Sequence, residues 1–245
     1  MTRTTLRTGA VMAMGFALAF SFALPAFAAS TTTQARAEAA ISKAETRAKQ
    51  EITRRIDALT KLATRVSEMK RLSDSEKSTL SANITAQINT LNTLEAKIAA
   101  DTDAATLKAD VQSITKSYRI FALIIPQGAI AAAADRIEAI AASSTELSAK
   151  LSTRITAAGA AGKDTTAMTT SLSDMNAKIA DANTQAQAAV SETASLQPDN
   201  GDKTVMTSNT AALKDARSKI QAAEKDLKAA KADAESIVKA VKGSR

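Results

Sequence analysis

The side chains of this chain that are best placed to bind a partner are cationic. Lysines and arginines recur at steps of seven and four between residues 36 and 65, which puts them on one stripe of a helix. Such a stripe would bind an anionic wall polymer, lipid headgroups or an acidic protein, and the binding would weaken with salt. The stripe consists of Arg36, Lys43, Arg47, Arg54, Lys61 and Arg65.

The charge of the chain is concentrated on this same segment. Residues 29–71 hold ten Lys/Arg against five Asp/Glu, whereas residues 72–245 hold twenty of each. The alternative interpretation is a solvated helix flank, supported by pairs four residues apart such as Glu51–Arg55 and Asp57–Lys61.

A second candidate contact region is apolar. Residues 118–134 form the most apolar part of the chain after residue 28 and contain its last two aromatic rings. A helix that is apolar all round is either buried on all sides or binds something. We expect burial at a junction between two halves of the chain, or else a surface for a lipid, a membrane or a client protein. The candidate contact residues are Tyr118, Phe121, Leu123 and Ile124.

The residue types argue against an enzyme. The chain has no cysteine and no histidine, which excludes disulfides, thiolate metal sites and the commonest neutral-pH acid/base. Asp199-Asn200-Gly201-Asp202 resembles the start of a calcium loop, but its glycine comes too early and no glutamate closes it. We predict a turn there, and no catalytic residue, cofactor, metal or nucleic-acid partner for the chain.

The first 28 residues have the pattern of a cleaved secretory signal. Arg3 and Arg7 precede an apolar stretch that ends at Pro25, and Ala26-Phe27-Ala28 forms a small-x-small cleavage site. We therefore expect an exported protein, periplasmic or secreted, that has no membrane span after cleavage.

The rest of the chain predicts helices throughout. Glycine and proline are scarce, at 7 and 3 residues, and apolar residues recur at steps of three and four. Ser73 and Glu76 are spaced as a capping box, and Pro126 and Gly128 are expected to separate the third helix from the fourth. Six helical segments result, near residues 33–72, 80–98, 107–125, 130–155, 168–196 and 213–241.

Heptad seams predict how these helices pack. In the fifth segment Met168, Met175 and Ala182 mark an unbroken alternation of four and three, and in the fourth segment Ile140 and Leu147 belong to the predicted seam. We predict an all-α fold, an elongated bundle of about six long helices. Alanine-rich seams of this kind pair within one chain or between chains, so a homo-oligomer is one outcome.

A faint internal repeat suggests a second architecture. Residues 55–59 resemble residues 136–140, which is compatible with two tandem three-helix, spectrin-like units joined near Pro126, or with chance similarity of amphipathic helices. The expected division is a signal peptide over 1–28, a unit over 29–125 with the basic first helix, and a coiled-coil-like unit over 126–245.

Residues 116–127, with the sequence KSYRIFALIIPQ, and the following Ala132-Ala133-Ala134-Asp135-Arg136 resemble a group of exported helical bacterial proteins of unknown function. The resemblance implies a helical fold and brings no activity, ligand or site residue. We expect a non-enzymatic structural or interaction protein of the cell envelope or exterior. The alternative is a periplasmic holdase that binds lipids or apolar clients.

Overall fold

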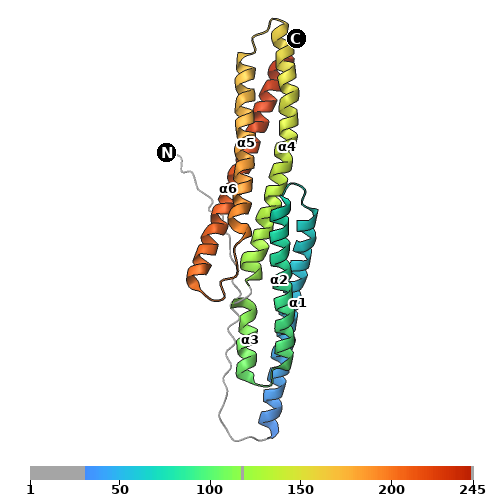
Figure 1. The fold of residues 1–245 in the computed structure, drawn as a ribbon, viewed down its shortest axis with the longest axis vertical. Coiled ribbons are helices and arrows are strands. Elements are labelled where there is room, and N and C mark those ends of the chain that lie inside the picture. The colour runs from blue at the N-terminus through green and yellow to red at the C-terminus, as the bar shows by residue number, and fades with distance from the viewer. Residues whose placement is uncertain (1–30, 117–118, 244–245) are drawn as a thin grey trace, which may run out of the picture. The chain divides into compact units, whose positions relative to one another are not determined.

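The computed structural model describes residues 31–116 and 119–243, and all regular structure among them is helical (Figure 1). Five of the helices are long and pack as a bundle, so the predicted all-α class is confirmed. The elements are α1 (Thr31–Glu68), α2 (Asp74–Ala100), α3 (Ala104–Lys116), the π-helical η1 (Ile120–Ile124), α4 (Ile125–Ala160), α5 (Thr166–Ala194) and α6 (Lys203–Gly243).

The chain forms two compact units, Met1–Glu38 and Ala39–Arg245. The described part of the first unit is the start of α1, where Gln34 Nε2 donates to Glu38 Oε1 at 3.4 Å. The predicted signal peptide, residues 1–28, lies outside the described residues. The interhelical contacts described below all lie within the second unit.

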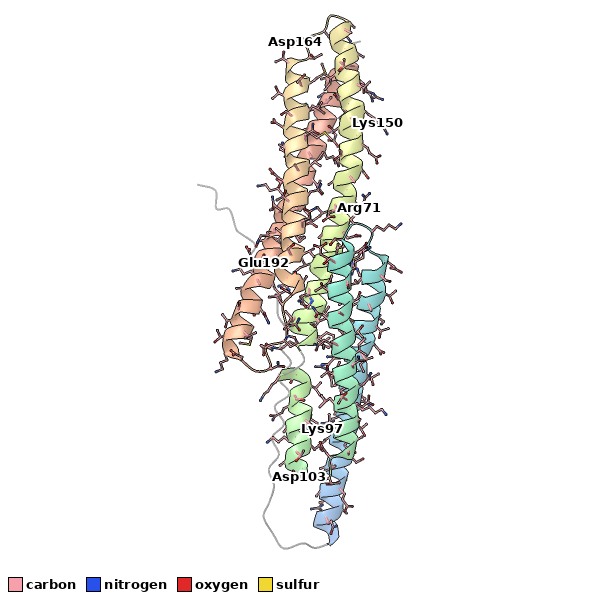
Figure 2. The ribbon with its side chains drawn as sticks, viewed as in Figure 1. Arg71, Lys97, Asp103, Lys150, Asp164 and Glu192 are labelled. Atoms are coloured by element: carbon pink, nitrogen blue, oxygen red, sulfur yellow. The ribbon has the colours of Figure 1, made fainter. Side chains whose placement is uncertain are left out.

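The turn between α1 and α2 is held by two carboxylates. Ser73 and Glu76 form the predicted capping box, in which the Glu76 N–H donates to Ser73 Oγ and the Ser73 N–H donates to Glu76 Oε2. Asp135 of α4 accepts from the backbone N–H of Arg71 at 2.5 Å and of Leu72 at 3.4 Å. The turn is thereby attached to the side of α4, and Arg71 is labelled there in Figure 2.

The predicted boundary between the third and fourth helices is wrong. The third helix does not run through the apolar segment, because α3 ends at Lys116 and Arg119 is not helical. The segment instead forms η1 and leads directly into α4, with Pro126 in the first turn of that helix. Proline is tolerated at this position because the first N–H groups of a helix have no intrahelical acceptor. Pro126 therefore begins a helix where we expected it to interrupt one.

The seams of α5 and α6 match the spacing in the sequence. α4, α5 and α6 pack against one another, and alanines such as Ala182, Ala186, Ala216 and Ala223 have no exposed surface. Small side chains at these positions let the helices approach closely. Every predicted residue of the α6 seam from Leu213 to Ile237 is buried.

The buried face of α4 differs from the predicted seam. Ile140 and Leu147 are exposed, at 46% and 41% of their surface. Ala141 and Ser148, one position further along the helix, are buried in their place. The spacing alone favours the larger side chains, but contact with α5 and α6 selects the smaller ones.

Gly128 allows α1 to lie close to α4. A Cβ atom added at Gly128 would lie 2.8 Å from Leu62 Cδ2 and 2.9 Å from Leu62 Cγ, well inside van der Waals contact. Leu62 is itself only 8% exposed. A side chain at position 128 would therefore require Leu62 to move, which favours glycine at this contact although glycine in a helix costs about 1 kcal/mol relative to alanine.

The C-terminal end of α5 is capped by side-chain amides from three other helices. Gln127 of α4 donates from Nε2 to the carbonyls of Thr193 at 2.6 Å and Leu196 at 3.0 Å. The last carbonyls of a helix have no intrahelical donor, and leaving them buried and unpaired is costly. Asn83 of α2 donates to Ala194 O at 3.1 Å, and Asn209 of α6 donates to Gln197 O at 2.8 Å.

The loop after α5 is ordered by Asp199, which is 6% exposed. Arg119 Nε donates to Asp199 Oδ2 at 2.6 Å, and the Gly201 N–H donates to Asp199 Oδ1 at 2.9 Å. Burial favours a higher pKa for Asp199, but these donors hold it below the ordinary value. Asn200 and Gly201 have φ of 49° and 91°, as a tight turn requires, so the turn predicted at residues 199–202 is confirmed.

Replacing Gln127 by leucine should destabilise the bundle. The Gln127→Leu variant places an apolar side chain in a site that is 2% exposed and removes the amide donor of the Thr193 and Leu196 carbonyls. We expect a loss of about 2–3 kcal/mol in the free energy of unfolding, measured by urea titration followed by circular dichroism. Gln221→Leu, at an exposed position on α6, is the matched control and should change stability by less than about 0.5 kcal/mol.

Candidate functional site

The cations of the predicted stripe are all exposed. Arg36 lies in the short first unit, and the other five lie on α1 within the second unit. At about 100° per residue, these five positions fall within about 40° of one another around the helix. They are Lys43, Arg47, Arg54, Lys61 and Arg65.

Most of these cations have no carboxylate partner. Among the described residues, no acid lies within ion-pair distance of Lys43, Arg47, Lys61 or Arg65. The predicted pair Asp57–Lys61 is thus not formed. The charges of these four cations are therefore not neutralised by ion pairs within the described chain.

The second predicted pair, Glu51–Arg55, does form. Arg55 Nη1 donates to Glu51 Oε2 at 2.5 Å and to the Glu51 carbonyl at 3.0 Å, and Arg55 is only 5% exposed. The same carboxylate lies 3.4 Å from Arg54 Nη2. Glu51 thus holds the guanidinium groups of two successive arginines.

Both arginines lie against Phe121. The guanidinium carbons of Arg54 and Arg55 are 4.8 Å and 5.3 Å from the centroid of its ring, within the range of cation–π attraction. Phe121 is 42% exposed. The structure therefore brings together one residue of the basic stripe and one of the apolar contact set. Arg55 was not among the predicted site residues, and its pairing with Glu51 was the only signal for it in the sequence.

The other apolar candidates are differently placed. Leu123 and Ile124 are buried, at 2% and 3% exposure, and belong to the main hydrophobic core. Tyr118 lies outside the described residues. In the described part of this segment, Phe121 is the one large apolar side chain that is exposed, so the segment serves mainly to pack the bundle.

The stripe leads to a shallow groove of about 300 Å³ where α1 meets α4. Arg65 and Arg136 lie at its edge together with two carboxylates, Glu68 and Asp135. Arg136 is already paired with Glu224 of α6 at 2.9 Å. The other lining residues of the groove are apolar: Met69, Ala129, Ala132 and Ala133.

Three carboxylates gather beside the α1–α2 turn. Burial, followed by the negative charges of Glu76 and Asp135, raises the pKa of Glu138 to about 7, and the charge of Arg71 opposes the shift. Glu76 and Asp135 each accept backbone hydrogen bonds in the turn. In the part of the chain that the structure describes, no three acidic side chains are grouped so as to hold a metal ion.

Between Ala104 and Ala160, one 18-residue window has a mean hydropathy of 1.5, apolar enough to cross a membrane. Within the fold 56% of that window is buried, and core helices of soluble proteins give the same signal.

No family model, curated protein or solved structure matches this chain. It is an all-helical protein for which no family is identified, and the resemblance of residues 116–136 to exported helical proteins stays a hypothesis.

Glu138 should make stability fall as pH rises. Its pKa of about 7 in the fold exceeds the ordinary 4.5, so the folded state binds the extra proton between these values. Stability from this group is complete below pH 4.5 and is lost as pH rises through 7. Glu138→Gln should therefore raise the free energy of unfolding by about 1–2 kcal/mol at pH 8, after allowance for solvent screening, and much less at pH 5. Equal effects at both pH values, or the same pH dependence in the exposed control Glu146→Gln, would contradict this assignment.

Proposed function

We propose that this protein is a non-enzymatic interaction protein of the bacterial envelope or exterior that binds an anionic polymer or an acidic protein through α1. The observation that carries the proposal is the exposed stripe whose cations, Lys43, Arg47, Lys61 and Arg65, have no carboxylate partner among the described residues. The location follows from the signal pattern of residues 1–28 and is part of the proposal.

The geometry of the stripe favours a partner with repeated charges. From Lys43 to Arg65 the helix rises about 33 Å, at 1.5 Å per residue. A small anion would contact one or two of these side chains, whereas a chain of phosphate or carboxylate groups would contact all of them. Such binding gains from the release of counterions and weakens steeply with salt.

Charge pairing elsewhere in the bundle supports a role for α1 in recognition. Between α5 and α6, Lys219 lies 2.7 Å from Glu192 and Lys178 lies 2.6 Å from Asp233, and Glu192 is labelled on α5 in Figure 2. These two lysines each form an ion pair with a carboxylate on the neighbouring helix. The stripe on α1 lacks this matching, as expected for a surface that meets an external anion.

The finer architecture belongs to the same proposal. Two tandem three-helix units over 29–125 and 126–245 would place the basic helix in one unit and the alanine-rich seams of α5 and α6 in the other. The alanine-rich seams would also allow self-association. In this mechanism the rigid helices of the bundle present the α1 stripe to the anionic partner, and the stripe makes the contact.

A holdase remains the second candidate, and the exposed ring of Phe121 is the observation in its favour. Burial of Leu123 and Ile124 leaves little apolar surface around that ring. Strong binding of an apolar dye that unfolded client peptides displace would favour the holdase over the polyanion-binding protein.

Charge reversal on the stripe should weaken polyanion binding. We expect the purified protein to bind fluorescein-labelled linear polyphosphate with an affinity that falls as salt rises, measured by anisotropy. The variant Lys43→Glu/Arg47→Glu/Lys61→Glu should weaken binding by roughly tenfold or more because it removes adjacent contacts.

The matched control carries the same change in net charge at other exposed lysines, as Lys108→Glu/Lys150→Glu/Lys214→Glu. It should weaken binding by less than about threefold, because these lysines lie on three different helices. Equal losses in the two triple variants would mean that net charge alone binds the polymer, and the proposed role of α1 would be wrong.

A further inference from the structure

A second groove lies between α4 and α6, toward their C-terminal ends. Its volume is about 680 Å³, and it is lined by Leu147 of α4 and by Ala234 and Val238 of α6. α4 and α6 also pack against α5. The groove is therefore an outer furrow of the α4–α5–α6 bundle.

The furrow carries apolar surface that the fold leaves uncovered. Leu147 is 41% exposed, and Ile140, one heptad earlier on the same flank of α4, is 46% exposed. Among the described residues, Ile140 and Leu147 are two of only five exposed large hydrophobic side chains. A fourth helix laid along two neighbouring helices is the usual cover for such a flank in helix bundles.

Lysines line the furrow along α6. Lys231, Lys239 and Lys242 all contribute to it, together with the single carboxylate of Glu235. Glu235 is paired with Lys231 at 3.7 Å. Within the described chain no carboxylate pairs with Lys239 or Lys242. The furrow thus combines an apolar floor with an excess of positive charge.

We propose that this furrow binds an acidic amphipathic helix of another protein. The three lysines extend over about 16 Å of α6, at 1.5 Å per residue. A fatty-acid carboxylate could neutralise only one of them, whereas glutamates on successive turns of a helix would meet the whole row. Apolar residues of the same helix would cover Leu147 and Ile140.

Synthetic helices of matched composition test this proposal. The probe is a labelled 18-residue peptide with leucines at heptad spacing and glutamates on both flanks, and its counterpart has lysine in place of each glutamate. We expect the glutamate peptide to bind the purified protein at least tenfold more tightly than the lysine peptide, measured by anisotropy at low salt.

Two variants assign the binding to the furrow. Lys239→Glu/Lys242→Glu should weaken binding of the glutamate peptide at least tenfold and strengthen binding of the lysine peptide. Leu147→Ser should weaken binding of the glutamate peptide at least fivefold. Both sites are exposed, so the fold should persist, which circular dichroism checks. The control Lys108→Glu/Lys214→Glu should change binding less than threefold.

Four results would overturn the proposal. Equal affinity for the two peptides would show that charge does not select the partner, and unchanged binding in the furrow variants would place the helix elsewhere. Saturable binding of laurate that Leu147→Ser abolishes, without peptide binding, would identify an amphiphile site. Self-association of the protein that Leu147→Ser removes would identify a second copy as the occupant.

Discussion

The capping of α5 by side-chain amides is the interaction on which the rest of the bundle depends. Gln127, Asn83 and Asn209 come from three different helices, and each donates to a carbonyl at the end of α5 or just after it. Each bond contributes only about 1 kcal/mol net, but leaving the buried carbonyls unpaired would cost more. The amides therefore fix where α2, α4 and α6 meet α5. Apolar seams alone, made largely of alanine, would permit helices to slide by a heptad.

How much of this could be predicted from the sequence depends on the range of the interaction. The seams of α5 and α6 and the capping box at Ser73 follow from spacing within one helix, and the prediction succeeded there. Pro126 was misinterpreted because the same residue ends or begins a helix according to its neighbours. Gln127 gave no signal, since its two acceptors lie more than sixty residues away.

The candidate site shows the same division. Exposure of the stripe followed from its helical spacing, whereas the contact of Arg54 and Arg55 with Phe121 required the fold. The furrow could not be predicted from the sequence, because the spacing of Leu147 predicts a buried seam residue. Only the packing of α4 shows that Leu147 is exposed. Lys178 and Lys219 join α5 to α6 through ion pairs, whereas Lys43, Arg47, Lys61 and Arg65 on α1 and Lys239 and Lys242 along the furrow have no carboxylate partner among the described residues.

Hydrogen exchange in the loop after α5 tests the central claim about this fold most directly. The N–H groups of Gly201 and Asp202 donate to Asp199, whose carboxylate is held by Arg119. If the capped end of α5 organises the bundle, these two loop amides should exchange only when the bundle opens, with protection close to that of buried Ala131 and Ala134 in α4. Exchange of both amides at the rate of an unstructured peptide, while α4 stays protected, would contradict the account.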